Sequence, residues 1–183
     1  GIFTLFSGVF SQGKWVNFIS ILGLFGALGV SLLPEFPFWS AYQKMFWYNE
    51  EASLFTSITL GVSLLIFLLG GFALYRHRNH QSEMYALVLF SLCGGFLLFG
   101  FQNMTTLFLG IEILSIPLYV LAGSEKTNLR SVEASVKYFL MGAFATGFLL
   151  FGIALVYGSS GSLNLMKISQ YSQEQGENFM FVL

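Results

Sequence analysis

Charge is what this sequence has least of, and the shortage limits its class. Of 183 residues only 9% are charged, with 8 basic residues, 9 acidic residues and no aspartate. An average soluble domain carries about 25% charged residues, so these are too few to cover a soluble surface. With a net charge of −1, the chain also lacks the basic excess that neutralises phosphates. We therefore expect neither a soluble enzyme nor a nucleic-acid-binding protein.

Cysteine and metal-ligating residues are also scarce. The single cysteine, Cys93, excludes an internal disulfide framework and a cysteine-based zinc or iron–sulfur site. Nine glutamates and two histidines leave little for a metal site of the soluble type. The sequence contains no GxGxxG, Walker, CxxC or HExxH motif, so nucleotide and metal binding have no support. We expect no cofactor and no metal in this chain.

Apolar sequence is what the chain has in abundance. Hydrophobic residues make up 55% of it, and 22 residues are phenylalanine. A bilayer-spanning helix needs about 20 apolar residues. Hydropathy therefore predicts an all-α, polytopic transmembrane helix bundle of about five full spans plus one partial span. The predicted full spans are residues 15–33, 52–75, 84–101, 105–122 and 131–157.

Small residues recur inside these spans. In lipid, small side chains let helix backbones approach closely, so their frequency predicts a packed bundle. The glycines concerned are Gly26, Gly29, Gly94, Gly95, Gly142, Gly147 and Gly152.

The connecting segments suggest how the spans are oriented. Residues 34–51 are aromatic and are predicted to lie at headgroup depth, with Trp39, Trp47 and Tyr48 at the interface. Residues 163–176 are polar, which is typical of an interfacial or lateral stretch. By the positive-inside rule, the cytoplasmic side is the one with five basic residues, and the other side has two. The five are Lys14, Arg76, Arg78, Lys126 and Arg130, and the two are Lys44 and Lys167.

Glu112 stands out because it lies in the middle of a predicted span. It is about nine residues, or ~13 Å, from either end of residues 105–122. An ionised carboxylate there costs at least ~2.5 kcal/mol, so it must be paired, hydrated or protonated. Pro117 removes a backbone N–H and can kink the helix, which would leave room for water. We favour a functional site over the alternative, a neutral glutamate that holds helices together.

Lys137 is the second charge inside the membrane, about six residues, or ~9 Å, from the end of its span. One interpretation is that it reaches back to the headgroups or pairs with Glu133 one turn earlier, in the favoured order of charges. The other is a pair with Glu112, since the two depths differ by roughly 4–5 Å, within the reach of a lysine. A lysine in such a pair can serve as a proton relay. Both interpretations stay open.

Three segments carry a family resemblance. Residues 107–123 (LFLGIEILSIPLYVLAG), 129–140 (LRSVEASVKYFL) and 147–158 (GFLLFGIALVYG) resemble the N-subunit family of proton-pumping NADH–quinone oxidoreductase, respiratory complex I. The match is dense over residues 105–165, and the spacing of Glu112 and Lys137 also fits the family. Upstream, over residues 1–102, only the order and length of the helices are similar.

The resemblance implies a domain organisation and a localisation. Residues 1–157 would be helices one (partial) to six of an antiporter-like subunit with fourteen, in the inner membrane of a bacterium. Residues 158–183 would be an external loop and the start of a next helix at residues 178–183. We therefore expect the sequence to be a piece of a longer protein.

The resemblance also implies a function. Glu112 matches the family's helix-five glutamate and Lys137 its helix-six lysine in a chain of proton-carrying groups, with Glu133 and Pro117 as possible support. The family's further lysines, on helices seven, eight and twelve, have no counterpart in this sequence. NAD, FMN, iron–sulfur clusters and quinone would bind elsewhere in the complex. The implied neighbours are the lipid bilayer, the antiporter-like subunit M and the small subunit K.

Two other functions compete with this one. The first is a subunit of a multisubunit cation/proton antiporter with no link to NADH, since the N-subunit family is related to subunits of such antiporters. The second is a structural membrane scaffold that transports nothing and in which Glu112 only packs helices.

Overall fold

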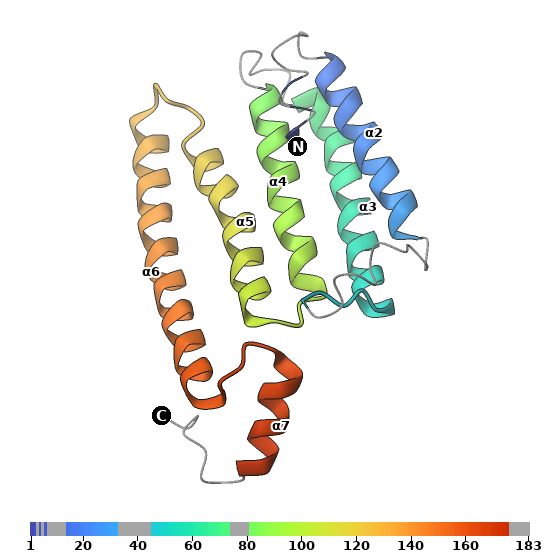
Figure 1. The fold of residues 1–183 in the computed structure, drawn as a ribbon. Coiled ribbons are helices and arrows are strands. Elements are labelled where there is room, and N and C mark those ends of the chain that lie inside the picture. The colour runs from blue at the N-terminus through green and yellow to red at the C-terminus, as the bar shows by residue number, and fades with distance from the viewer. Residues whose placement is uncertain (3, 5, 7–13, 33–44, 74–80, 176–183) are drawn as a thin grey trace.

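The structure is a row of helices that run up and down. The computed structural model describes the chain except residues 3, 5, 7–13, 33–44, 74–80 and 176–183. Within the described residues the helices are α2 (Lys14–Ser31), α3 (Glu50–Ala73), α4 (Gln81–Phe99), α5 (Met104–Ala122), α6 (Leu129–Ser160) and α7 (Leu165–Gln175). Helices α2, α3 and α4 form one group, α5 lies beside α4, and α6 lies beside α5 at the far edge (Figure 1). The predicted all-α helix bundle is confirmed.

Four of the five predicted spans are confirmed by length and composition. Helices α3, α4, α5 and α6 are long and apolar enough to cross a membrane. The first predicted span, residues 15–33, corresponds to α2, whose apolar part (Val16–Ser31) is shorter than the other four. Helix α6 has 32 residues, or about 48 Å, against a hydrocarbon thickness of about 30 Å. It is therefore longer than one straight crossing requires, and it contains the whole of the predicted span 131–157.

Some predictions fall on residues outside the described ranges. They concern most of the partial first helix, of which residues 2, 4 and 6 are described and helical. They also concern the aromatic segment around Trp39, the basic residues Arg76 and Arg78, and the next helix at residues 178–183. These stay predictions.

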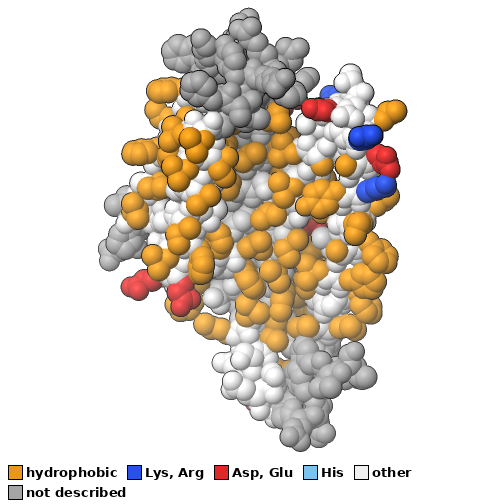
Figure 2. All heavy atoms as spheres, turned by 180° about the vertical axis from the view of Figure 1, so that it is seen from behind, with side chains coloured by type: hydrophobic (Ala, Val, Ile, Leu, Met, Phe, Trp, Pro, Cys, Tyr) orange, Lys and Arg blue, Asp and Glu red, His pale blue; other side chains and the backbone are white. Residues whose placement is uncertain are grey.

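The packed core lies among α2, α3 and α4. Val16 and Leu24 of α2, Leu60 and Phe67 of α3, and Tyr85 of α4 form one buried cluster. The rings of Phe67 and Tyr85 have their centroids 5.0 Å apart. By contrast, the long helix α6 contains no buried residue. The apolar surface of the bundle forms a broad band, while charged side chains gather towards its two ends (Figure 2).

The helix ends follow from local sequence. Asn103 precedes α5 and its side-chain oxygen accepts a hydrogen bond from the Thr105 backbone N–H at 2.8 Å. Asn128 does the same for α6, accepting from Arg130 N at 3.1 Å. Asparagine is a favoured residue at this capping position. At the other end of α6, Gly161 takes the left-handed conformation with φ 64°, which favours glycine.

Extended backbone ties one end of the bundle together. Trp47 N donates to Gly100 O at 2.7 Å, and Gln102 N donates to Met45 O at 3.0 Å. On the other side of the same segment, Leu165 N donates to Gln102 O at 3.0 Å. The segment between α4 and α5 is therefore bonded both to the chain before α3 and to the first residue of α7.

Helix α7 forms where the sequence predicted an external loop with an interfacial or lateral stretch. Leu165, Ile168 and Tyr171 are partly buried along one side of it, whereas Lys167 is exposed. The helix lies at the opposite end of the bundle from Lys126 and the α5–α6 turn (Figure 1). This agrees with the prediction that Lys126 and Lys167 occupy opposite sides of the membrane.

The glycines differ in what they do. A Cβ added to Gly94 would lie 2.3 Å from the Leu114 backbone nitrogen, and one added to Gly142 would lie 1.9 Å from the Tyr119 hydroxyl oxygen. At Gly95 the nearest such contact is an ordinary 3.7 Å. No described atom lies within 4 Å of an added Cβ at the other predicted positions, Gly26, Gly29, Gly147 and Gly152. The predicted close packing is thus confirmed at Gly94 and Gly142, and at the other five predicted glycines the structure shows no close contact.

Candidate functional site

Helix α5 has one face packed tightly against α4. The three atoms nearest to a Cβ added at Gly94 are all backbone atoms of α5, from Ile113 and Leu114. Ser91 of α4 donates its hydroxyl to the Leu114 carbonyl oxygen at 2.9 Å. Gly110 lies on the same face, with Leu98 of α4 against it. The backbones of α4 and α5 therefore touch, and nothing larger than glycine fits between them at residue 94.

The opposite face of α5 is turned towards α6. Tyr119 is buried there, with 8% of its surface exposed. Its ring packs edge-on against Tyr138, with centroids 4.8 Å apart, and against Phe139 at 6.0 Å. Ser135 donates its hydroxyl to the Tyr119 carbonyl oxygen at 2.7 Å. This contact is made by side chains that fill the space between the two helices.

Glu112 lies on the face of α5 that is turned towards α6. It precedes Tyr119 by seven residues, which is nearly two full turns, so the two side chains share one side of the helix. Glu112 is half-buried and stands eight residues after the first residue of α5. None of the residues that the structure describes donates a hydrogen bond to its carboxyl group or forms an ion pair with it. The carboxyl group is thus placed in mid-span without a partner from the described chain.

Pro117 sits inside α5 without ending it, since the helix continues to Ala122. Because proline has no N–H, the helix loses one donor to the carbonyl of Ile113, four residues earlier. Pro117 is buried and, seven residues after Gly110, lies on the face packed against α4. The weakened backbone is therefore next to Gly94 of α4, on the other side of the helix from the Glu112 side chain.

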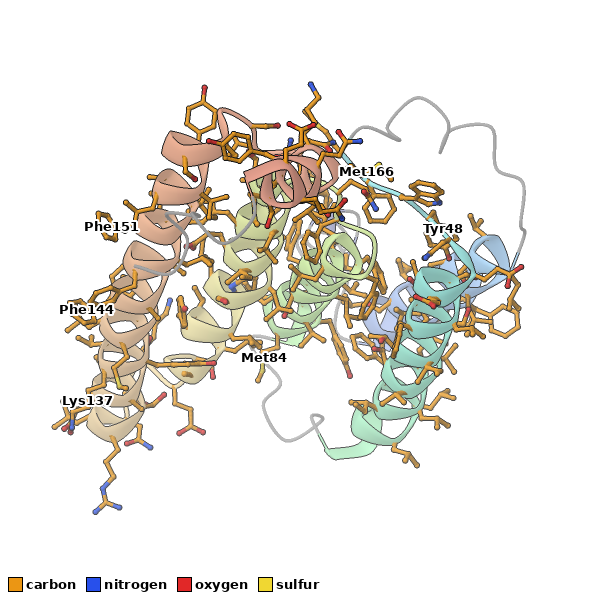
Figure 3. The ribbon with its side chains drawn as sticks, turned by 90° about the horizontal axis from the view of Figure 1, so that it is seen from below. Tyr48, Met84, Lys137, Phe144, Phe151 and Met166 are labelled. Atoms are coloured by element: carbon orange, nitrogen blue, oxygen red, sulfur yellow. The ribbon has the colours of Figure 1, made fainter. Side chains whose placement is uncertain are left out.

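Lys137 points away from α5. It forms an ion pair and a hydrogen bond with Glu133, one turn earlier on α6, and both side chains are exposed, by 69% and 62%. Lys137, Phe144 and Phe151 recur every seven residues and lie together on the outer side of α6 (Figure 3). Of the two interpretations of Lys137, the structure therefore shows the local pair with Glu133. Glu112, on α5, faces the inner side of α6, whereas Lys137 lies on the outer side of α6. The two side chains therefore do not meet.

The depth of Lys137 can be judged from the α5–α6 contact. Ser131 donates its hydroxyl to the carbonyl of Ala122, the last residue of α5, at 2.7 Å. Lys137 follows Ser131 by six residues, or about 9 Å along the helix. It thus lies inside the level at which α5 ends, and its depth in the membrane stays a prediction.

Tyr119 and Gly142 form part of the α5–α6 contact on the side of Glu112, and our sequence analysis did not identify them as residues of this site. The seven-residue spacing between Glu112 and Tyr119 was a usable signal, because it places both on one helix face. The contact of Gly142 with the Tyr119 hydroxyl depends on how α5 and α6 are aligned, which the sequence does not reveal. Among the described residues, no group of three or more His, Cys or Glu side chains could hold a metal ion.

The fold and this site define a class. The chain is a polytopic integral membrane protein, and it carries a carboxyl group halfway along a spanning helix, facing the neighbouring helix. Ionisable residues in such positions generally mark ion or proton pathways.

Comparisons with known proteins identify relatives of this class. Residues 101–183 match a family described as "NADH:quinone oxidoreductase/Mrp antiporter, TM". The chain is 41% identical over 173 residues to NADH-quinone oxidoreductase subunit N of Cytophaga hutchinsonii, covering 93% of this chain and 37% of that protein. It is 37% identical over 172 residues to the protein of the same name from Flavobacterium johnsoniae, covering 94% and 37%.

Solved structures agree with these relatives. A chain of respiratory complex I from Thermus thermophilus with bound aureothin has a TM-score of 0.68 and 31% identity, over 90% of this chain and 36% of that one. An archaeal membrane-bound sulfane sulfur reductase has a TM-score of 0.77 at 20% identity, over 96% and 38%. The second likeness shows the fold alone.

The expected resemblance is therefore confirmed. The chain is a relative of the antiporter-like subunit N of bacterial NADH–quinone oxidoreductases and is an integral protein of the bacterial membrane. It spans a little over a third of the length of the curated relatives that it matches.

Proposed function

We propose that this chain belongs to a membrane-arm subunit of a proton-pumping NADH–quinone oxidoreductase in the bacterial inner membrane. The single observation that supports it most is Glu112, half-buried in mid-span and without a partner among the described residues. Its sequence surroundings lie inside the segment that matches the NADH:quinone oxidoreductase/Mrp antiporter family.

The chemistry follows from where Glu112 stands. A carboxyl group can take up and give up a proton, and an ionised one at this depth is costly unless a positive charge or water stands beside it. A positive charge brought close favours the ionised form, which releases the proton into the chain of carriers. Glu112 is therefore the group that takes up and gives up the translocated proton. Lys137, paired with Glu133 on the far side of α6, is the next carrier that we assign.

The role of the whole complex is part of the same proposal. NADH oxidation and quinone reduction would occur in other subunits, so that NAD, FMN, iron–sulfur clusters and quinone bind outside this chain. This chain then contributes proton movement and no redox centre. Its neighbours in the membrane arm would be subunits M and K, together with lipid.

The test is Glu112→Gln in the assembled enzyme in native membranes. Glutamine keeps the shape of the side chain but cannot carry a proton. We expect proton pumping and coupled NADH turnover to fall at least tenfold, an effect of about 1.4 kcal/mol or more, while the amount of assembled complex stays unchanged. Pumping at the normal rate in this variant would exclude Glu112 from the mechanism.

A matched control uses Glu133→Gln, because Glu133 is exposed near the beginning of α6. This control should reduce pumping less than Glu112→Gln. If Glu112→Gln lowers the stability of the complex but leaves pumping intact, the structural-scaffold function is correct instead.

A second candidate function is a subunit of a cation/proton antiporter without a link to NADH. The description of the matching family favours it, since it covers Mrp antiporters as well. Sodium-dependent proton exchange in vesicles that lack a quinone reductase would support it. NADH-driven pumping that needs Glu112 would exclude it.

A further inference from the structure

One hydroxyl group of α4 crosses to the backbone of α5. Ser91 donates to the carbonyl oxygen of Leu114 at 2.9 Å. Two buried serines in neighbouring helices, Ser20 of α2 and Ser63 of α3, donate instead to carbonyls of their own helices, four residues earlier. Such a local bond is always within reach of a serine in a helix. Ser91 therefore makes a bond between two helices that its own helix does not require.

The carbonyl that Ser91 reaches lies in the interior of α5. Two serines of α6 also donate to α5, Ser135 to the Tyr119 carbonyl and Ser131 to the Ala122 carbonyl. Both acceptors belong to the last four residues of α5, whose carbonyls have no partner inside their own helix. The end of the helix thus explains these two bonds. Leu114 stands eight residues before that end, so its bond from outside needs another reason.

Pro117 supplies the reason. Proline has no N–H, so the carbonyl of Ile113, four residues earlier, loses its donor, and the proline ring crowds the same turn. Leu114 is the next residue in that turn. A proline inside a membrane helix is tolerated when neighbouring helices and serine or threonine side chains satisfy the backbone groups that it loosens. Ser91 does this from α4, because it bonds to the carbonyl next to the one that Pro117 leaves without a donor.

Gly94 brings α4 close enough for this bond. It follows Ser91 by three residues, so the two lie on one face of α4. A Cβ at Gly94 would lie 2.3 Å from the Leu114 nitrogen and 2.7 Å from the Ile113 carbonyl carbon. The peptide that joins Ile113 and Leu114 is therefore held twice, by close packing at Gly94 and by the hydrogen bond from Ser91. This peptide follows Glu112 directly in the chain.

We propose that Ser91 is a positioning residue for Glu112. Its hydrogen bond holds the turn of α5 that Pro117 weakens, so the backbone from which the Glu112 side chain extends keeps its place. The carboxyl group on the α6 side then stays at a fixed position relative to the groups that exchange protons with it. Ser91 acts through the backbone, because it contacts the face of α5 opposite to the Glu112 side chain. This inference rests on the function proposed for Glu112.

The experiment compares two serines in the assembled complex. Ser91→Ala removes the hydroxyl that joins two helices, whereas Ser20→Ala removes a buried hydroxyl that bonds within α2. The first readout is the infrared band of the Glu112 carboxyl group, assigned by its loss in Glu112→Gln. We expect Ser91→Ala to shift this band and to lower pumping about 2- to 10-fold, the size of one hydrogen bond between neutral groups. Ser20→Ala should change neither, and Ser91→Thr, which keeps the hydroxyl, should restore both.

A band that stays unmoved in Ser91→Ala, or that moves equally in Ser91→Thr, would overturn the inference. Normal pumping in Glu112→Gln would instead overturn the proposed function, while the Glu112 band still tests Ser91, so the two failures are distinguishable.

Pro117→Ala sharpens the test and guards against a failure of Ser91→Ala to assemble. Alanine returns an N–H to this turn of α5, so the loss of the Ser91 hydroxyl should matter less. We expect Ser91→Ala to shift the Glu112 band less when Pro117→Ala is also present. Where Ser91→Ala alone does not assemble, the double variant should. An equal shift with and without Pro117→Ala, or a double variant that also fails to assemble, would contradict the role of Ser91.

Discussion

The two sides of α5 are built in different ways. Towards α4, backbone meets backbone, with Gly94 against the peptide that joins Ile113 and Leu114. Towards α6, the space is filled by the ring of Tyr119 and by serine hydroxyls that bond to α5 carbonyls. The first contact is closed, whereas the second holds the Glu112 carboxyl group, which has no partner among the residues that the structure describes.

This difference gives the two sides of one helix different physical properties. A contact made by backbone leaves no room for water or for a moving proton. A contact made by long side chains can change its rotamers and admit water at modest cost. Pro117 weakens the helix on the closed side, where α4 supports it, and Glu112 lies on the other. We infer that α4 holds α5 in place while the α6 side carries the chemistry.

The largest expected effect comes from closing the tight side further. Gly94→Ala would place a methyl group 2.3 Å from a backbone nitrogen, and backbone cannot give way as a side chain can. Overpacking of this kind costs about 3 kcal/mol. We expect a marked fall in the thermal midpoint of the solubilised complex, or loss of assembly.

Gly95→Ala is the matched control for that variant. The nearest contact of its added methyl group is an ordinary 3.7 Å to a leucine side chain. Alanine also favours a helix over glycine by up to about 1 kcal/mol. Gly95→Ala should therefore leave stability unchanged or raise it. Equal loss in both variants would contradict the close approach of α4 and α5 at Gly94.

An intermediate effect is expected on the α6 side. Gly142→Ala collides with the end of a side chain rather than with backbone, so the ring of Tyr119 can move. We expect a loss of about 1–2 kcal/mol, measured as the thermal midpoint. Adding Tyr119→Phe should relieve part of it, because the next ring atom is still only 2.5 Å from the added Cβ.

Gly147→Ala provides the reference on the same helix, since no described atom lies within 4 Å of its added Cβ. It should be neutral or slightly stabilising. Strictly additive losses from Gly142→Ala and Tyr119→Phe would mean that the two residues do not touch.

The smallest effect on stability is expected at the outer face of α6. Lys137 and Glu133 are both more than half exposed, and exposed pairs one turn apart contribute about 0.3–0.5 kcal/mol. Lys137→Met should therefore change the thermal midpoint very little. If Lys137 carries protons, the same variant lowers pumping. A loss of stability as large as that of Gly94→Ala would instead show that this pair is buried in the complex.

Much of this fold could be predicted because membrane helices are set by local sequence. The apolar runs predicted α3 to α6 to within a few residues, since in lipid every backbone group must be satisfied inside the helix. Glu112 was found because a carboxyl group in mid-span is rare. The pairing of Lys137 was left open because both candidate partners are within reach of a lysine. Only the rotation of α6, which turns Lys137 away from α5, selects Glu133.

Sequence and tertiary structure thus decided different things. Composition and hydropathy predicted the class, the spanning helices and the depth of Glu112 and Lys137, and the residues of three segments carried the resemblance to the N-subunit family. Each of these depends on residues close together in the chain. Side-chain neighbours depend on how helices are aligned and turned about their axes. That is why only the tertiary structure showed that Gly94 closes one side of α5, and that Gly142 seats the hydroxyl of Tyr119 on the side of Glu112.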